Sequence, residues 1–183
     1  MSGPHVASGY WGRPEESAEL FAAHLAGDPE RRFFRTGDLG TVIDGEVVVT
    51  GRSKDVIIIR GVNYYPHDIE DTMQAAHPEL RPDYAAAFSV PGNETEMLVL
   101  VQGTDSRRDD HQSLAQAADQ IIEAVTRDHS LRPDVVVLVA PKHIPRTSSG
   151  KIRRSATRDA YLSGGLPALY QWSAVSTAGG PPG

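Results

Sequence analysis

The chain has 183 residues, 39% hydrophobic and 23% charged, which fits one compact domain with a smaller appended piece. Its net charge of −6 argues against a general nucleic-acid surface, and the absence of cysteine excludes disulfides, thiolate metal sites and a cysteine nucleophile. No apolar run approaches the roughly 20 residues of a membrane span, and residues 1–11 lack the charged and apolar blocks of a signal peptide, so we expect a cytoplasmic protein.

The N-terminal part contains signals for a helix and a hairpin. Pro14 and the acidic residues after it suit a first helical turn, and an apolar side continues through residues 20–25. Residues 42–43 and 46–50 flank Asp44-Gly45, a dipeptide that accepts the positive φ angles of a tight turn. We therefore predict a helix followed by a β-hairpin.

A polar break at residues 51–55 separates this hairpin from the β-branched run of residues 56–59, for which a buried strand is predicted. We place a domain boundary in the break. Residues 1–53 are interpreted as the terminal piece of a large domain, and residues 54–166 as a second domain.

The second domain alternates helical and strand patterns. Helices are predicted over residues 66–76, 113–125 and 152–162, and strands over residues 85–90, 97–102 and 135–139. The fold class is therefore α+β, a small mixed sheet with packed helices. Residues 167–183 are expected to be a disordered tail.

Asp38 stands between glycines just before the hairpin, in Arg35-Thr36-Gly37-Asp38-Leu39-Gly40. A carboxylate held in a turn can accept two hydrogen bonds from a vicinal diol such as a ribose. An aspartate at such a position can equally be a simple turn former.

Three further motifs follow in order: Gly51-Arg52-Ser53-Lys54-Asp55, residues 61–70, and Pro145-Arg146-Thr147-Ser148-Ser149-Gly150-Lys151. The ordered set resembles the adenylate-forming superfamily of acyl-CoA synthetases, peptide-synthetase adenylation domains and luciferases. The similarity runs from about Gly3 to Leu166. Residues 57–70 and 77–90 are more similar to fatty-acyl-AMP ligases than to their CoA-using relatives.

The resemblance implies two half-reactions. A fatty acid and ATP first give acyl-AMP and pyrophosphate, and the acyl group then passes to the phosphopantetheine thiol of an acyl-carrier protein. ATP and AMP are the implied cofactors, with Mg²⁺ as the counter-ion of ATP. The implied partners are the fatty acid, the carrier protein and a large adenylation domain, which would hold most of the ATP and its Mg²⁺.

The resemblance also implies a role for five residues. Lys151 matches the catalytic adenylation lysine, and Asp38 and Arg52 match residues beside the AMP ribose. Lys54 matches the hinge about which the C-terminal lid rotates between the half-reactions. Gly61 matches a glycine that lines the pantetheine tunnel.

Each of these residues has a simpler interpretation. Lys54 can be an ordinary surface lysine, and Gly61 a turn glycine after a strand. The loop before Lys151 can be a helix N-terminus capped by Thr147 or Ser148. Glu70 is expected only to charge the helix that it belongs to, and we assign it no chemistry.

The family's phosphate loop and acyl pocket are missing from the 183 residues, so we expect the chain alone to be inactive. Two alternatives remain open: the C-terminal domain of an acyl-CoA synthetase, and a non-catalytic fragment or carrier-binding module. The histidines lack the spacing of a zinc site, and we predict no metal ligands.

Overall fold

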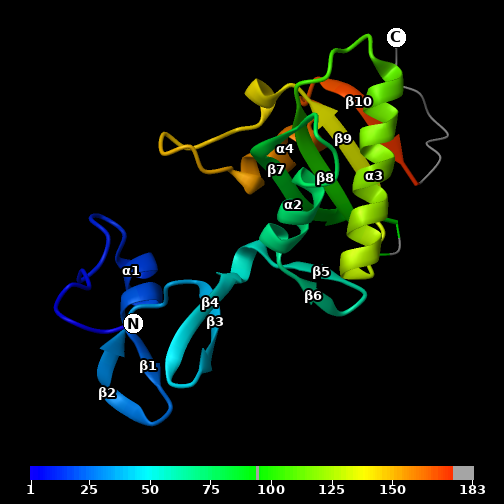
Figure 1. Cartoon of the computed structure of the whole chain (residues 1–183). Coiled ribbons are helices and arrows are strands. Elements are labelled where there is room, and N and C mark those ends of the chain that lie inside the picture. The colour runs from blue at the N-terminus through cyan, green and yellow to red at the C-terminus, as the bar shows by residue number, and fades with distance from the viewer. Residues whose placement is uncertain (94, 175–183) are drawn as a thin grey trace. The chain divides into compact units, whose positions relative to one another are not determined.

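The computed structural model describes residues 1–93 and 95–174, which form two compact units (Figure 1). The first unit is Met1–Lys54 and the second begins at Asp55, so the division falls inside the polar break at residues 51–55. Within the described residues, no helix is both long and apolar enough to cross a membrane.

The first unit contains one helix and two hairpins. Its elements are α1 (Pro14–Phe21), β1 (Ala23–Leu25), β2 (Asp28–Phe33), β3 (Asp38–Ile43) and β4 (Glu46–Arg52). The strands pair antiparallel as β1 with β2 and β3 with β4. The β3–β4 turn has Asp44 and Gly45 at φ angles of 51° and 84°, the conformation that the sequence predicted for this dipeptide.

The first helix is shorter than its apolar pattern suggested. It ends at Phe21, and residues 23–25 form β1, because they pair with β2 across a short turn. The ring of Phe21 packs against Phe34 and Tyr10, with centroid distances of 4.6 and 5.3 Å. No residue of this unit is fully buried, so it has no closed hydrophobic core of its own.

The second unit is built on a four-stranded mixed sheet in the order β10-β9-β8-β7. Its strands are β7 (Leu80–Pro91), β8 (Glu96–Thr104), β9 (Val135–Val139) and β10 (Ala168–Ser173). β7 pairs antiparallel with β8, β8 parallel with β9, and β9 antiparallel with β10. The parallel pair requires a crossover, which the helix between β8 and β9 supplies.

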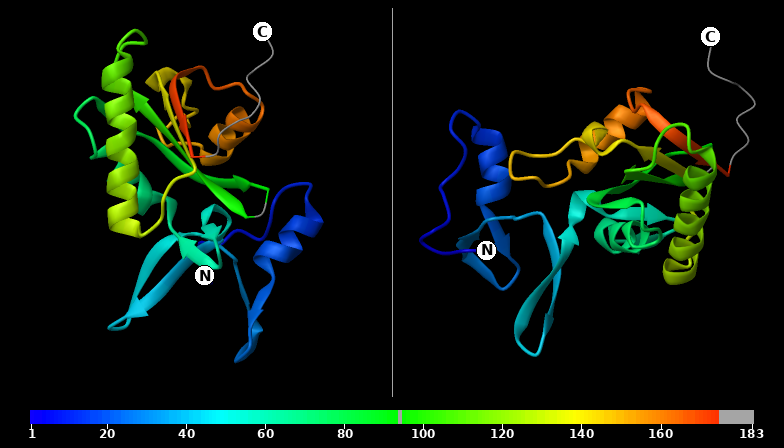
Figure 2. Two further views of the ribbon diagram at one scale, coloured as in Figure 1. Left: turned by 90° about the vertical axis from the view of Figure 1, so that its right-hand side faces the viewer. Right: turned by 45° about the horizontal axis from the view of Figure 1, so that its top comes forward.

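Helices cover both faces of this sheet (Figures 1 and 2). Helices α2 (Pro66–Gln74) and α3 (His111–His129) pack on one face, and α4 (Arg154–Leu162) packs on the other. Helix α3 begins where Asp110 accepts a hydrogen bond from the Ser113 amide at 3.0 Å. This layered arrangement confirms the predicted α+β class with a small mixed sheet.

Alternation along the strands explains the two cores. One cluster lies under α2 and α3 and includes Ala85, Ala87, Leu98, Leu100, Val136 and Leu138. The other lies on the α4 side and includes Ala86, Phe88, Val99, Val101, Val135 and Val137. The strands are apolar on both faces because helices exclude water from each face.

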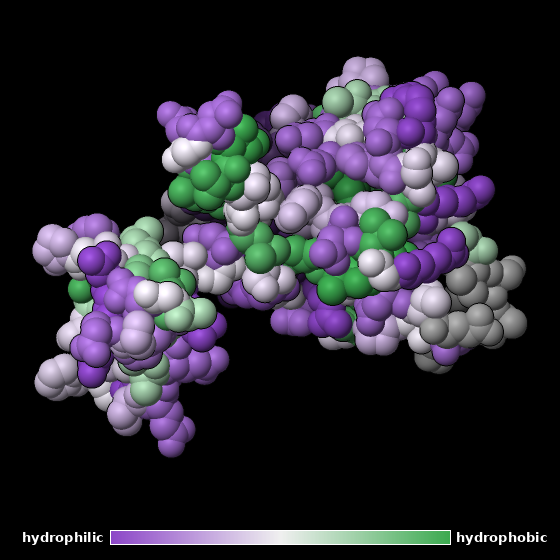
Figure 3. All heavy atoms as spheres, turned by 90° about the horizontal axis from the view of Figure 1, so that it is seen from below, coloured by the Kyte–Doolittle hydropathy of each residue, from purple (hydrophilic) through white to green (hydrophobic). Residues whose placement is uncertain are grey.

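The β-branched run before α2 forms the strand that was predicted, but this strand is buried on one face only and belongs to a hairpin. β5 (Ile57–Ile59) pairs with β6 (Val62–Tyr64). Ile57 and Ile59 are buried in the α2–α3 cluster, whereas Ile58 is 54% exposed. Hydrophobic side chains such as Ile58 therefore reach the surface among polar ones, as Figure 3 also shows for the face that it draws.

The prediction of a disordered tail from residue 167 is wrong for its first part. Residues 168–173 form β10, because Tyr170 and Trp172 pack against the α2–α3 cluster while the backbone pairs with β9. Residues 175–183, the rest of that predicted tail, lie outside the described residues. Two short 3-10 turns complete the chain, η1 (Ser53–Asp55) and η2 (Pro141–His143).

Candidate functional site

Lys151 lies in a loop that closes on itself by hydrogen bonds. The Thr147 amide donates to the Lys151 carbonyl at 2.8 Å, and the Lys151 amide donates to Thr147 Oγ1 at 3.0 Å. Gly150 has a φ of +85°, which favours glycine, and its amide donates to the Thr147 carbonyl at 2.9 Å. Thr147 thus stabilises the loop itself and does not cap α4, whose N-cap is Arg153.

Arg146 anchors the first side of this loop. Its Nε donates to the Gly150 carbonyl at 2.6 Å, and its guanidinium lies 4.4 Å from the centre of the Tyr84 ring on β7. The Arg146 backbone also forms an isolated antiparallel bridge with Ile152. A side chain that stacks on an aromatic face while donating to a carbonyl holds the loop against the sheet.

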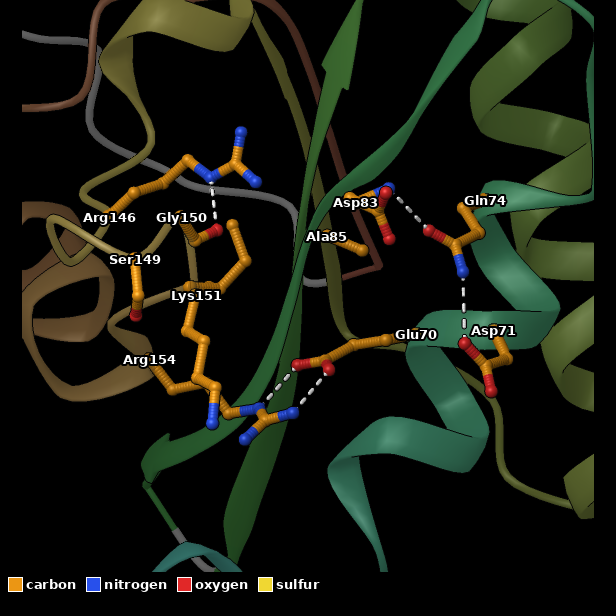
Figure 4. A pocket seen from close by; sticks show the side chains of 11 residues that line it. Glu70, Asp71, Gln74, Asp83, Ala85, Arg146, Ser149, Gly150, Lys151 and Arg154 are labelled. Atoms are coloured by element: carbon orange, nitrogen blue, oxygen red, sulfur yellow. Dashed lines mark hydrogen bonds and ion pairs between the residues drawn. The ribbon is translucent and has the colours of Figure 1, made fainter.

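The Lys151 side chain is exposed and lines a cleft of about 410 Å³. Figure 4 shows this cleft between the loop, α2 and β7, with Arg146, Arg154, Glu70, Asp71 and Asp83 among the other lining residues. Within the described part of the chain, the Lys151 ammonium has no hydrogen bond and no ion pair. The backbone of Lys151 is therefore held by the loop, while its ammonium group is available to a ligand.

The lining of the cleft also contains a pair of residues that the sequence analysis missed. Arg154 donates from Nε and Nη2 to the two carboxylate oxygens of Glu70, each at 2.6 Å. Glu70 is only 7% exposed and also accepts a hydrogen bond from the Ala87 amide at 3.0 Å. Glu70 was expected only to charge its helix, whereas the structure also gives it a structural contact with Arg154 and β7. Its sequence signal was a carboxylate on the buried face of a helix, which requires a partner.

Burial and pairing act in opposite directions on this carboxylate. Burial raises the pKa of Glu70 above its ordinary value, while the hydrogen bonds from Arg154 and from the Ala87 amide oppose that rise. Hydrogen bonding to Glu70 raises the pKa of Arg154, so the guanidinium keeps its proton. A permanently charged, planar guanidinium is the group best suited to a bidentate contact with a buried carboxylate.

Asp38 and Arg52, both predicted beside a ribose, lie opposite each other on β3 and β4. They are Cα partners in the strand register, and Arg52 Nε lies 3.3 Å from Asp38 Oδ1. The Asp38 side chain is 36% exposed, so its carboxylate can still accept hydrogen bonds from a ligand. An exposed carboxylate oriented by a guanidinium suits a vicinal diol.

Lys54 and Gly61 occupy two short connections. Lys54 is an exposed residue in η1, at the division between the two units. Gly61 follows Arg60 at the tip of the β5–β6 hairpin, where the two residues have φ angles of 78° and 51°. A Cβ at Gly61 would have no neighbour within 4 Å, so this glycine is needed for the turn and not for internal packing.

No group of three or more His, Cys, Asp or Glu residues in the described ranges 1–93 and 95–174 is arranged to hold a metal ion. The candidate ligand-binding features considered among the described residues are the Lys151 loop with its cleft and the Asp38–Arg52 pair. Both consist of charged groups that recognise anions or hydroxyls.

Residues 54–171 match the family described as the AMP domain of Disco-interacting protein 2-like proteins. The chain belongs to this family. It is also 47% identical over 171 residues to the medium-chain-fatty-acid–[acyl-carrier-protein] ligase JamA of Moorena producens. A second relative, the long-chain-fatty-acid–AMP ligase FadD26 of Mycobacterium tuberculosis, is 41% identical over 177 residues.

The AMP-domain chain covers only part of each relative. The alignments include 93% and 92% of this chain but 28% of JamA and 30% of FadD26. A fatty acid AMP ligase from Legionella pneumophila aligns with a TM-score of 0.54 and 36% identity, over 94% of this chain and 30% of that one. The resemblance to adenylate-forming enzymes, and to fatty-acyl-AMP ligases in particular, is confirmed.

A second structural relative was solved with an aminoacyl-adenylate and not a fatty acyl group. The McyG A-PCP structure, complexed with phenylalanyl-adenylate, aligns with a TM-score of 0.72 and 31% identity, over 86% of this chain and 23% of that one. Fatty-acid ligases and an amino-acyl adenylation domain thus share this part of the fold. We expect the residues that select the substrate to lie in other parts of those proteins.

Proposed function

We propose that this chain is the C-terminal part of a fatty-acyl-AMP ligase that charges an acyl-carrier protein. The observation that carries the proposal is the Lys151 ammonium, which has no partner among residues 1–93 and 95–174 and lies on an anchored loop beside an open cleft. The similarity to JamA and FadD26, which are named as fatty-acid ligases, supports the substrate class.

In the first half-reaction, a carboxylate oxygen of the fatty acid attacks the α-phosphorus of ATP. A new P–O bond forms, and the bond between the α-phosphorus and the oxygen that bridges to the β-phosphate breaks. Pyrophosphate then leaves, for which Mg²⁺ would be the counter-ion. The Lys151 ammonium would contact the attacking carboxylate and the α-phosphate. It would offset the negative charge that accumulates when these two anions approach.

Asp38 and Arg52 are proposed to bind the ribose of AMP. The Asp38 carboxylate would accept hydrogen bonds from both ribose hydroxyls, and Arg52 would orient that carboxylate and add a charge-assisted donor. These residues bind the nucleotide in both half-reactions, so their loss should weaken nucleotide binding without selecting one step.

In the second half-reaction, the phosphopantetheine thiol of the carrier attacks the acyl carbon, and AMP leaves. Rotation about Lys54 would remove Lys151 and bring the Gly61 turn to the entering thiol arm. The printed name of JamA includes an acyl-carrier protein, which supports a carrier as the acceptor. Gly61 suits this role because no side chain would obstruct the arm.

An acyl-CoA synthetase is the second candidate. A Mycobacterium leprae relative named as a putative fatty-acid–CoA ligase is 41% identical over 169 residues, so a CoA-using assignment has its own support. The two candidates share the adenylation step and differ in the thiol that accepts the acyl group.

The test is a chimera in which this chain replaces the matching region of JamA. It should form acyl-AMP from a medium-chain fatty acid and ATP and load a carrier protein, as detected by mass spectrometry. Abundant acyl-CoA with unmodified carrier would favour the second candidate. Absence of ATP–pyrophosphate exchange, with native JamA active in parallel, would overturn both. The isolated 183-residue chain should give no exchange, because it contains no phosphate loop.

A further inference from the structure

Arg154 connects three elements of the second unit. It begins α4, three positions after Lys151, and its guanidinium donates to both oxygens of Glu70 on α2. Its Nη1 also lies 3.6 Å from Oδ2 of Asp55, the last residue of η1. One side chain therefore joins the end of the Lys151 loop to α2 and to the start of the unit.

Glu70 extends this connection to the sheet. The oxygen that accepts from Arg154 Nε also accepts the hydrogen bond from the Ala87 amide on β7. Because the carboxylate is buried and has three donors, its position is fixed by α2, β7 and α4 together. Such a buried two-bond contact is geometrically specific, unlike the exposed single contact between Arg81 and Asp105.

We propose that the Glu70–Arg154 pair is a positioning device for Lys151. This inference rests on the proposed adenylation function. The loop is held at its first side by Arg146 on Tyr84 and at its second side by Arg154 on Glu70, with Lys151 between them. Only two residues separate Lys151 from Arg154, so a shift at Arg154 must move the lysine backbone.

A contribution to stability alone explains the pair less well. A buried ion pair loses much of its Coulombic gain to desolvation, and apolar residues of similar volume often stabilise a fold as much. What apolar residues cannot supply is a directional contact that fixes the orientation of the neighbouring backbone, which includes Lys151. Displacement of a reacting group by about 1 Å can lower a rate on the order of a hundredfold.

The test uses two variants that keep the size of the side chain. Glu70→Gln retains an acceptor for the Ala87 amide but loses the charge. Arg154→Lys retains the charge but cannot make the bidentate contact. In the JamA chimera, each should slow single-turnover adenylation on the order of tenfold to a hundredfold. Transfer from supplied acyl-AMP should be unchanged. Asp105→Asn, which removes a carboxylate from the exposed pair with Arg81, is the matched control.

A second measurement separates positioning from a general effect on the fold. In a Lys151→Ala background, either variant should cause no additional loss of adenylation, because the pair acts through the lysine. Losses that add in this background, or equal losses in both half-reactions, would overturn the proposal. An unchanged adenylation rate in both single variants would do the same. If Glu70→Gln does not fold, Arg154→Lys alone decides.

A third measurement does not depend on the proposed function. In the intact 183-residue chain, Arg154→Lys should speed hydrogen exchange at the Gly150, Lys151 and Arg153 amides on the order of tenfold, with exchange in α3 unchanged. If Lys151→Ala leaves adenylation intact in the chimera, the proposed function fails. Unchanged loop exchange would instead reject the positioning role.

Discussion

The exposed ammonium of Lys151 differs from most charged groups around its cleft, because it has no partner in the described residues. We predict that Lys151→Ala in the JamA chimera slows acyl-AMP formation on the order of a hundredfold, since a preorganised charge of this kind contributes roughly 3 kcal/mol. Transfer from supplied acyl-AMP to the carrier should survive. Single-turnover kinetics of the two half-reactions provide the measurement.

Lys142→Ala is the control for this experiment. Lys142 is an exposed lysine in η2, outside the residues that line the cleft, so its loss should leave both steps near the chimera's rate. Equal slowing of both half-reactions by Lys151→Ala would contradict a role confined to adenylation. The same conclusion would follow if Lys142→Ala gave the larger defect.

Asp38 is predicted to act through nucleotide binding. Asp38→Asn should raise the KM for ATP on the order of tenfold, because hydrogen bonds to a charged group contribute about 1.5–3 kcal/mol. The rate at saturating ATP should change less. Asp44→Asn is the matched control, since Asp44 lies in a tight turn at φ 51°, a conformation that asparagine also tolerates. A KM unchanged by Asp38→Asn would exclude the ribose assignment.

At the scale of single elements, local signals identified the β3–β4 hairpin, α2 and α3. The Asp44-Gly45 turn and the apolar side of α3 act over a few residues, and local sequence contains that information. The β5–β6 hairpin was missed because Arg60-Gly61 interrupts what reads as a strand followed by a loop. The turn of this hairpin needs a positive φ at Arg60, and no strong local sequence signal predicts that conformation for an arginine.

The candidate site likewise contains residues that the sequence could identify and residues that it could not. The Lys151 loop was found because its residues are contiguous, whereas Glu70 and Arg154 are 84 positions apart and meet only in the folded chain. A carboxylate on a buried helical face is a signal that the residue needs a partner, but this signal does not identify Arg154 as that partner. Arg146 on Tyr84 is a similar case, since stacking depends on how the sheet presents the ring.

The edge strand β10 gives a test of stability at this scale. A chain ended after residue 167 loses the pairing with β9 and the packing of Tyr170 and Trp172, in addition to the contact of Arg132 over the Trp172 ring. We expect it to be less stable than a chain ended after residue 174 by more than about 2 kcal/mol, because burying a large side chain contributes about 1.5–3 kcal/mol. Urea unfolding followed by circular dichroism measures the difference. Equal midpoints would show that β10 contributes little.

At the scale of the whole molecule, the two units differ in how they are stabilised. The second has two buried clusters, whereas none of residues 1–54 is fully buried. The β3–β4 hairpin leaves a row of large apolar side chains in water: Val42, Ile43, Val47, Val48 and Val49. Exposed patches of this kind indicate a contact surface, and under the proposed function we expect a large adenylation domain to cover it.

The proposed function requires the backbone to change between the two half-reactions, and η1 lies at the division between the units. Lys54→Pro fixes φ near −65°, a value that a 3-10 turn already adopts, so the η1 conformation should be retained. We predict that this variant keeps adenylation largely intact in the chimera if η1 belongs to the adenylating arrangement. Transfer to the carrier should fall on the order of tenfold, about 1.4 kcal/mol in the barrier, because rotation is restricted.

Lys54→Ala separates the backbone from the side chain in this experiment. It removes the ammonium but leaves φ free, so both half-reactions should proceed near the unmodified chimera's rate. Single-turnover transfer from supplied acyl-AMP is measured in the two variants side by side. If Lys54→Ala slows transfer as much as Lys54→Pro, the side chain and not the backbone is responsible. If Lys54→Pro impairs neither step, rotation occurs elsewhere in the chain and Lys54 is an ordinary surface lysine.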